Sequence, residues 1–243
     1  MRIPFKRFSE TEHETWRELY SRQNKKRGDQ MVDQFSAGLE VLKIGSEKIP
    51  DLDQVNRLLR AQTGFSGVPV EGLKEPISFF KMLSQREFPI GNFIRDSKDL
   101  NYTPAPDVFH DLYGHLPFFA DQRYADFCAE FGRRALRHQD HPELILQFDR
   151  LFWFTIEFAL IQSRQGLRIF GAGIASSYAE CEYALGGQPE LIPFDLERIR
   201  AQEFKIDEFQ RRLFVLGSSS ELYRCLPAFE EGFWFSGKDQ AVS

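Results

Sequence analysis

The sequence predicts a mainly α-helical fold with a few short β-strands. Apolar residues recur at helical spacing in several segments, and Ser, Asp and Gly residues stand where those segments would begin and end. Two shorter stretches, residues 88–94 and 209–216, favour extended structure. The chain has no internal repeat, low-complexity tract or clear linker, so we expect residues 1–243 to form a single domain.

The N-terminal half predicts four helices. Ser9 and Glu12 have the spacing of a capping box, which predicts a helix that begins there and ends at the polar segment Lys25–Gly28. The stretch 65–75 is rich in Gly, Pro and Val, and we expect it to be a loop. Three more helices are expected over residues 29–44, 51–62 and 76–84.

The C-terminal half predicts a long, largely buried helix over residues 143–164. A glycine-rich turn is expected at 170–177, after which Ser177 and Glu180 repeat the capping-box spacing at the start of another helix. Further helices are expected over residues 121–137, 196–203 and 221–229.

Composition and charge argue against several classes of protein. The net charge of −5 and the isoelectric point of about 5.6 disfavour a nucleic-acid-binding surface. No run of about 18 apolar residues is present, so we expect no membrane span. The first residues lack the apolar stretch of a secretory signal. The three cysteines, Cys128, Cys181 and Cys225, are widely spaced, which is typical of reduced thiols in a cytoplasmic protein.

Two of the five histidines, His110 and His115, lie five residues apart in the stretch 106–118. Asp107 follows a proline and is a good N-cap, so a short helix is expected to carry His110 on its first turns. An uninterrupted α-helix would separate the two imidazoles by roughly 140°. We expect Gly114 to end the helix in the left-handed conformation, which lets His115 turn back toward His110.

Glu157 is the only ionisable residue in the apolar stretch 151–161. A carboxylate buried there must find a cation or become protonated, because the loss of its hydration is costly. A divalent metal shared with His110 and His115 would stabilise the charge, and two imidazoles with one carboxylate are the ligand set of non-haem Fe(II) oxygenases. The plainer alternative is a pair of hydrogen-bonded histidines at a helix end. The isolated carboxylate favours the metal.

Other patterns are weaker candidates for function. His138 and His141 stand in a polar, loop-like segment and are expected to be solvated. The segment Gly171–Gly173 lacks the dinucleotide-binding pattern, and a tight turn close to a cavity is the better interpretation. Arg95 follows a strand-like stretch and precedes the histidines, so its guanidinium could hold a substrate that bears a carboxylate.

Three segments resemble the catalytic domain of the tetrahydropterin-dependent aromatic amino acid hydroxylases, most closely that of the single-domain bacterial phenylalanine 4-hydroxylases. They are YTPAPDVFHDLYGHLP at 102–117, FWFTIEF at 152–158 and GAGIASS at 171–177. The resemblance extends from about Trp16 to Phe209. It implies that the single domain is a catalytic domain with the fold of that family.

The resemblance also implies roles for individual residues. Fe(II) is expected to be bound by the catalytic residues His110, His115 and Glu157. The amino acid substrate is expected to contact Arg95, which holds its carboxylate, together with Thr103, Asp107, Trp153 and Ser176. The tetrahydropterin is expected beside Val70, Gly72, Leu73, Phe79 and Asp111, with its ring stacked on Phe79. Phe118 is expected close to Trp153 at the wall of the substrate pocket.

The resemblance implies a monooxygenase that uses Fe(II), O₂ and tetrahydrobiopterin or a related pterin to hydroxylate an aromatic amino acid, first of all L-phenylalanine to L-tyrosine. The same chemistry on tryptophan or at another ring position, as in meta-tyrosine, stays open. A metal-dependent hydrolase and a non-catalytic binding protein are alternatives of a different class. A chain of 243 residues leaves no room for the regulatory domain and tetramer helix of the animal enzymes, so we expect a cytoplasmic monomer or weak dimer.

Overall fold

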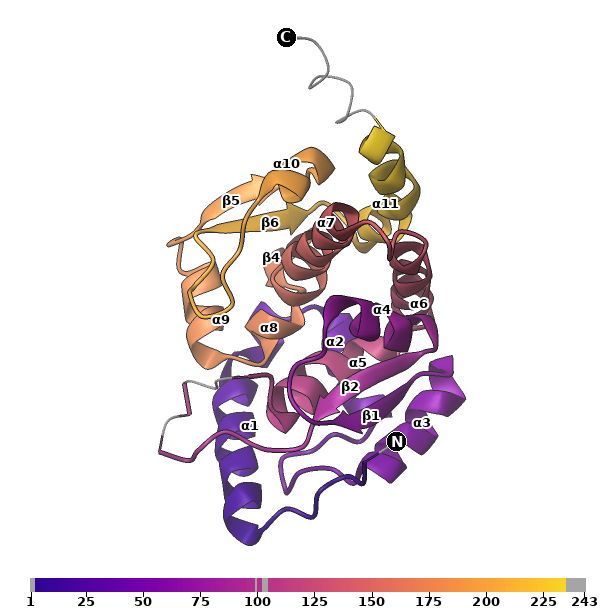
Figure 1. Cartoon of the computed structure of the whole chain (residues 1–243). Coiled ribbons are helices and arrows are strands. Elements are labelled where there is room, and N and C mark those ends of the chain that lie inside the picture. The colour runs from indigo at the N-terminus through magenta and orange to yellow at the C-terminus, as the bar shows by residue number, and fades with distance from the viewer. Residues whose placement is uncertain (1–2, 99, 102–104, 235–243) are drawn as a thin grey trace.

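Helices dominate the computed structural model, which describes residues 3–98, 100–101 and 105–234 (Figure 1). The α-helices are α1 (Glu10–Gln30), α2 (Asp33–Val41), α3 (Leu52–Thr63), α4 (Pro76–Ser84), α5 (Leu116–Phe119), α6 (Gln122–Leu136), α7 (Pro142–Phe152), α8 (Ala172–Ala175), α9 (Tyr178–Leu185), α10 (Leu196–Ala201) and α11 (Ser219–Glu231). Two π-helices, η1 (His110–His115) and η2 (Trp153–Glu157), and a 3₁₀ turn, η3 (Gly232–Trp234), complete the helical part. The predicted fold class is confirmed.

Among the described residues, six short strands form two sheets in different parts of the molecule (Figure 1). The smaller sheet pairs β1 (Ser66–Val70) with β2 (Glu87–Gly91) in parallel, with α4 as the crossover, and it lies beside α3. The larger sheet has the order β4-β3-β6-β5. Its strands are β3 (Leu160–Ser163), β4 (Gly166–Ile169), β5 (Glu190–Pro193) and β6 (Arg212–Leu216). Strand β3 runs antiparallel to β4 and parallel to β6, and β5 runs parallel to β6.

Local capping signals predicted several helix ends. The capping box before α1 forms in both directions, because the Ser9 N–H donates to Glu12 at 2.8 Å and the Glu12 N–H donates to the Ser9 hydroxyl at 3.4 Å. Helix α3 begins after Asp51, whose carboxylate accepts the N–H of Gln54, and it ends at Gly64 in the left-handed conformation. Helix α4 covers the predicted residues 76–84. These ends depend on contacts within a few residues.

Three predictions in the N-terminal half are wrong. Helix α1 continues through Lys25–Gly28 to Gln30, because the Lys and Arg residues there are good helix formers and only their polarity suggested a break. The second helix is shorter than predicted and covers only Asp33–Val41. The expected loop 65–75 contains β1, which forms because β2 supplies a pairing partner more than 20 residues along the chain.

The long helix predicted over 143–164 is also wrong. Helix α7 ends at Phe152, the chain continues as the π-helix η2, and β3 follows at Leu160–Ser163. The last residues of the predicted helix form a strand because they pair with β4 on one side and β6 on the other. Strands β3, β4 and β5 were not predicted, whereas β6 falls inside the expected extended stretch 209–216.

Aromatic side chains fill much of the core around η1. Tyr113, in the middle of η1, is fully buried, with its ring 5.2 Å from Tyr20, 5.3 Å from Phe35 and 4.8 Å from Phe109. The three cysteines are buried and form no disulfide, as predicted. Among the described residues, no helix is both long and apolar enough to cross a bilayer.

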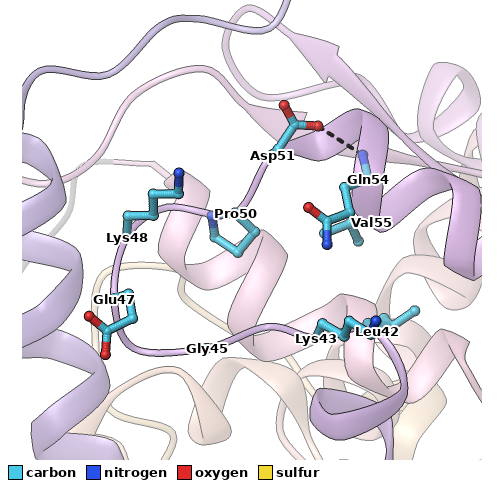
Figure 2. A pocket seen from close by; sticks show the side chains of 9 residues that line it. All are labelled: Leu42, Lys43, Gly45, Glu47, Lys48, Pro50, Asp51, Gln54 and Val55. Carbon is cyan, nitrogen blue, oxygen red and sulfur yellow. Dashed lines mark hydrogen bonds between the residues drawn. The ribbon is translucent and has the colours of Figure 1, made fainter.

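A surface pocket of about 220 Å³ lies between the end of α2 and the start of α3 (Figure 2). It is lined by Leu42, Lys43, Gly45, Glu47, Lys48, Pro50, Asp51, Gln54 and Val55. None of the described residues that were predicted to bind metal, substrate or pterin lines this pocket, so the candidate site has to be built from the triad itself.

Candidate metal centre and active site

Two imidazoles and one carboxylate converge where η1 faces η2. The Nε2 atoms of His110 and His115 lie 3.0 Å apart. The Glu157 carboxylate lies 3.0 Å from Nε2 of His115 and 3.7 Å from Nε2 of His110. The exposed fractions of the His110, His115 and Glu157 side chains are 14%, 1% and 14%. The three side chains grouped by the sequence analysis therefore lie together in a largely buried site.

The two histidines meet because the helix that carries them is a π-helix. Asp107 accepts the N–H of His110 at 2.9 Å, so the predicted N-cap is confirmed. The N–H of Leu116 bonds to the carbonyl of Asp111, five residues back, and this wider winding brings residues i and i+5 closer to the same side of the helix than an α-helix would. The predicted helix end at Gly114 is wrong, because Gly114 lies inside η1 and has no positive φ.

Position 114 requires a glycine because α8 packs directly against η1. A Cβ atom at Gly114 would lie 2.8 Å from the carbonyl oxygen of Ala172 and 3.0 Å from Cβ of Ser176. This approach places the Ser176 hydroxyl 2.8 Å from Nδ1 of His110 and 3.2 Å from the carbonyl oxygen of Gly173. When the hydroxyl donates to that carbonyl, it accepts from Nδ1–H, and the Nε2 lone pair of His110 points to the centre.

Glu157 reaches the centre through the second π-helix. The N–H of Phe158 bonds to the carbonyl of Trp153, five residues back, at 2.9 Å. The Gly171–Gly173 backbone then packs against Glu157, since a Cβ at Gly171 would lie 2.2 Å from the Glu157 carbonyl oxygen and a Cβ at Gly173 would lie 3.1 Å from its Oε2. The glycines thus bring backbone close to the site, as the sequence predicted, but Gly171 caps and Gly173 lies in the short helix α8, where a turn was expected.

The charges of the triad fit a divalent metal. Burial lowers the pKa of His110 to about 4, so its ring is neutral at pH 7 and offers a lone pair. Burial acts to raise the pKa of Glu157, but His115, His110 and the Gly173 N–H hold this pKa below its usual value. Metal bonds of about 2.1 Å at right angles would place neighbouring donor atoms about 3.0 Å apart. The separations of 3.0 Å between the two Nε2 atoms and between Nε2 of His115 and Glu157 match that spacing.

Arg95 is buried and bound on one side by Asp107. The Asp107 carboxylate accepts from Nε of Arg95 at 2.8 Å, from Nη2 at 2.9 Å and from the backbone N–H at 2.9 Å. Burial opposes the ionisation of Asp107, yet the hydrogen bonds and charge of Arg95 lower its pKa below the usual value. Asp107 thereby fixes the guanidinium and also caps the helix of His110. Thr103, predicted to contact the substrate, lies outside the described residues.

Trp153 is half-buried at the start of η2, between two aromatic rings. Its ring lies 4.6 Å from that of Phe158 and is stacked 4.5 Å from that of Phe204. Its Nε1–H has no hydrogen-bond partner among the described residues. Phe204 was not singled out from the sequence, because it lies in a polar segment with no motif. Phe118 is not a pocket wall but a core residue that packs on Phe35, Tyr124 and Phe170, because α5 turns its side chain inward.

The residues predicted to contact a pterin lie at one end of the small sheet. Val70 ends β1, Gly72 follows with a φ of 61°, and Leu73 is 70% exposed. Phe79, on α4, is half-buried and meets the rings of Phe80, Phe88 and Phe152 edge-on. Asp111 is buried and accepts the Gly91 N–H, at the end of β2, at 2.6 Å. Phe88 connects this region to the triad, since its ring lies 4.4 Å from that of His115.

The second histidine pair is separate from this site. His141 is exposed, as predicted. His138 is half-buried, contrary to the prediction, because α11 packs over it: Nε2 lies 3.2 Å from the Glu230 carboxylate, and the ring is stacked on Phe148.

Comparison with known proteins assigns the chain to a protein family. Residues 1–233 match the family model described as biopterin-dependent aromatic amino acid hydroxylase. The chain belongs to this family. It is similar to the phenylalanine-4-hydroxylases of Chromobacterium violaceum, 38% identical over 90% of this chain and 74% of the relative, and of Caulobacter vibrioides, 40% identical over 88% and 73%.

A solved structure of a family member has the same fold. The C. violaceum phenylalanine hydroxylase with bound iron(III) and oxidised cofactor 7,8-dihydrobiopterin aligns with a TM-score of 0.91 and 36% identity, over 98% of this chain and 86% of that one. The resemblance inferred from three short segments therefore extends over most of the chain, and the two π-helices and the small sheet belong to a hydroxylase fold.

Proposed function

We propose that the protein is an Fe(II)- and tetrahydropterin-dependent monooxygenase that converts L-phenylalanine to L-tyrosine. The observation that carries this proposal is the convergence of His110, His115 and Glu157 on one point in a member of the biopterin-dependent hydroxylase family. The similar proteins of Chromobacterium violaceum and Caulobacter vibrioides are phenylalanine-4-hydroxylases, which supports phenylalanine as the substrate.

The triad residues hold the metal on one face. Two imidazoles and one carboxylate would supply three ligands and leave other positions open for O₂ and water. When bound, ferrous iron and a reduced pterin together supply the electrons that activate O₂, one oxygen atom of which enters the aromatic ring. Ser176 fixes the ring of His110 through Nδ1, and this support keeps Nε2 directed at the metal.

Arg95 and Trp153 position the substrate. The guanidinium of Arg95 is fixed by Asp107, so its remaining N–H groups can hold the carboxylate of the amino acid in a defined direction. Trp153 and Phe204 form an aromatic wall against which the substrate ring can pack. Orientation of this kind, together with exclusion of water, is the contribution that a protein makes to a cofactor-dependent reaction.

The pterin binds at the end of the small sheet, between the segment Val70–Leu73 and Asp111, with its ring on Phe79. The contact between Phe88 and His115 makes this place adjacent to the metal. Residues 1–243 act as a single catalytic domain, a monomer or weak dimer in the cytoplasm. The buried cysteines, which form no disulfide, favour a reducing compartment.

The test is aerobic turnover of L-phenylalanine with Fe(II) and a tetrahydropterin, with products separated against ortho-, meta- and para-tyrosine and with tryptophan in parallel. Para-tyrosine that disappears without pterin is the expected result. Meta-tyrosine or hydroxytryptophan would keep the mechanism and change the specificity. Activity on an ester or amide without O₂ and pterin would indicate a metal-dependent hydrolase, and one bound iron without any turnover would indicate a binding protein.

A further inference from the structure

Within the part of the chain that the structure describes, the small sheet consists of two parallel strands, so each has one edge that no other strand pairs with. The N–H of Ser66 donates to the carbonyl of Arg86, at the β2 side. Because backbone groups alternate in direction along a strand, Ser66, Val68 and Val70 face β2, whereas Gly67 and Pro69 face outward. A two-stranded sheet with two unpaired edges is marginally stable. Other groups must therefore hold these edges.

Asn56 closes the outer edge of β1. Its Nδ2 donates to the carbonyl of Gly67 at 2.9 Å, and its Oδ1 accepts the Gly67 N–H at 2.7 Å. Asn56 lies in the middle of α3 and is 5% exposed. The amide thus bonds to both backbone groups of one residue, as a neighbouring strand would. Pro69, the other outward residue, has no N–H to satisfy.

The contact between α3 and β1 is close and rigid. A Cβ atom at Gly67 would lie 2.8 Å from Cγ1 of Ile90 and 3.0 Å from Cδ1 of Leu52, the first residue of α3. The strand therefore sits directly on the helix, and Asn56 sets its position along the helix.

Asp111 likewise binds a backbone group on the outer edge of β2. Gly91 faces outward and donates its N–H to Asp111, while the other outward residue near the end of this strand, Pro89, again has no N–H. Val70 and Gly91 are register partners at the carboxyl ends of the two strands. Ligands of parallel sheets bind outside these ends. One amide and one carboxylate thus hold, from two sides, the strand pair whose end carries Val70–Leu73.

We propose that Asn56 is a positioning residue for the pterin, which it acts on through β1 without touching it. The proposal rests on the proposed function, which places the pterin between Val70–Leu73 and Asp111. Asn56 fixes Gly67, three residues before Val70. Because Gly67 and Val70 belong to the same strand, the placement of β1 also sets the place of the segment Val70–Leu73 at its end. Without the amide, the two backbone groups of Gly67 are left unsatisfied in a buried place, and β1 separates from α3.

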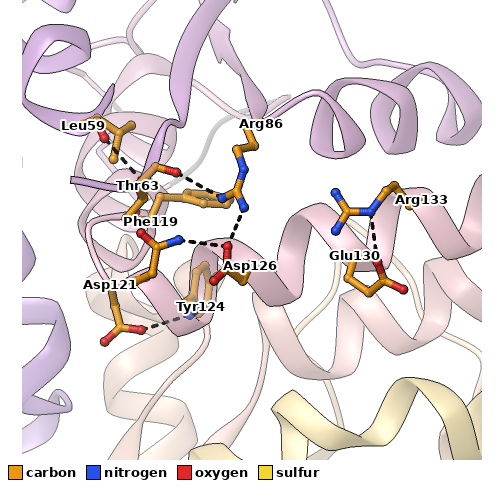
Figure 3. Close-up of polar contacts among 10 residues, drawn as sticks. Leu59, Thr63, Arg86, Phe119, Asp121, Tyr124, Asp126, Glu130 and Arg133 are labelled. Carbon is orange, nitrogen blue, oxygen red and sulfur yellow. Dashed lines mark hydrogen bonds and ion pairs between the residues drawn. The ribbon is translucent and has the colours of Figure 1, made fainter. Parts of the chain in front are cut away.

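A second residue of α3 offers a matched control. The Thr63 hydroxyl donates to the carbonyl of Phe119 at 2.8 Å, and its carbonyl accepts from Arg86, which also pairs with Asp126 (Figure 3). Thr63 is as buried as Asn56, but its hydroxyl binds α5 and not β1. Thr63→Val removes a buried hydrogen bond from the same helix and leaves the edge of β1 intact.

The experiment compares wild type, Asn56→Leu, Asn56→Asp and Thr63→Val. Asn56→Leu removes both bonds to Gly67 and keeps the branched shape of the side chain, and Asn56→Asp keeps only the acceptor for the Gly67 N–H. The affinity for 7,8-dihydrobiopterin is measured by calorimetry on the iron-loaded protein, and amide hydrogen exchange is followed for residues 66–70. KM for phenylalanine and the iron content are measured in parallel.

We expect Asn56→Leu to bind 7,8-dihydrobiopterin about tenfold more weakly and to exchange faster at residues 66–70, with iron content and KM for phenylalanine unchanged. Asn56→Asp should show a smaller change in the same direction. If Asn56→Leu does not fold, Asn56→Asp is compared with Thr63→Val in its place. Thr63→Val should lower the melting temperature but keep wild-type pterin affinity. Equal pterin affinities in the Asn56 and Thr63 variants would overturn the inference alone. A wild-type protein that binds no pterin would overturn the proposed function as well.

Discussion

Glu157 carries the only negative charge of the triad. Glu157→Gln replaces the carboxylate with a neutral amide of the same shape, which is a poor ligand for a divalent metal. We expect loss of bound iron and of turnover, with little change in the circular dichroism spectrum. Iron content and product formation measure this, with the exposed Glu143 as a matched control through Glu143→Gln. Normal turnover by Glu157→Gln would mean that this carboxylate is not a ligand.

Arg95 has two tasks that the structure separates. Its guanidinium neutralises Asp107, which is completely buried, and its free N–H groups are proposed to hold the substrate carboxylate. Arg95→Leu would leave an unpaired buried charge, which typically costs about 3–5 kcal/mol of stability. That substitution therefore tests folding as much as binding.

Arg95→Lys is the sharper variant, because it keeps the positive charge but cannot form the two-armed contact. We expect KM for phenylalanine to rise about tenfold or more while KM for the pterin stays unchanged. Steady-state kinetics with each substrate varied in turn measures the difference. Arg212→Lys, at an exposed ion pair with Glu190, serves as the control. An unchanged KM for phenylalanine would remove Arg95 from the substrate site.

Helix η1 shows how far the sequence could predict the site. The meeting of His110 and His115 was predicted, but for a wrong reason, since a helix end at Gly114 was expected in place of a π-helix. A π-helix has no sequence signal of its own, because it forms where tertiary contacts favour a wider turn. Here those contacts come from α8, which lies more than 50 residues further along the chain.

Gly114→Ala tests this account of η1. The added Cβ would lie 2.8 Å from the carbonyl oxygen of Ala172, so η1 and α8 must separate and the bond from His110 to Ser176 weakens. We expect lower iron affinity and a lower melting temperature. Gly28→Ala is the matched control: nothing lies within 4 Å of its Cβ, and it should stabilise α1 by about 0.5–1 kcal/mol. Undiminished iron affinity in Gly114→Ala would contradict the account.

The strands were predicted less well than the helices for a related reason. The helices α3 and α4 begin and end at residues whose capping or backbone preference is local. Strand β1 lies in a segment of Gly, Pro and Val that forms a strand only because β2 and Asn56 bind its two edges. Strand β3 likewise depends on β4 and β6. Partners far along the chain cannot be predicted from the short segment that they stabilise.

Across the whole molecule, the family resemblance predicted what local patterns could not. The metal ligands already followed from the histidine spacing and the isolated Glu157, whereas the pterin and the aromatic amino acid followed only from the three segments. The helix boundaries around two of those segments were wrong. The unpredicted π-helix η2, together with β3 and β4, brings Glu157 and the segment Gly171–Gly173 together. The fold is therefore the means by which segments more than 40 residues apart in sequence form one centre.

Glu180 is a buried carboxylate outside the site. Its protonation in the folded protein can be tested by measuring how overall stability depends on pH. Glu180, at the start of α9, has its Oε2 buried without a hydrogen-bond partner among the described residues. The predicted capping box is only half formed, since the Glu180 N–H donates to Ser177 at 3.3 Å but the carboxylate returns no bond. Burial raises the pKa of Glu180 to about 7, from an ordinary value of 4.5.

The sign of the effect follows from this raised pKa. Between pH 4.5 and 7 the folded state holds the proton that the unfolded state has lost, so the contribution of Glu180 to stability is largest below pH 4.5. It falls as the pH rises, by about 3 kcal/mol once the pH exceeds 7. Glu180→Gln removes this loss. We expect its melting temperature to exceed that of the wild type clearly at pH 8 and only slightly at pH 5, whereas the exposed control Glu203→Gln changes neither. An equal shift of Glu180→Gln at both pH values would show that Glu180 is not protonated in the folded protein.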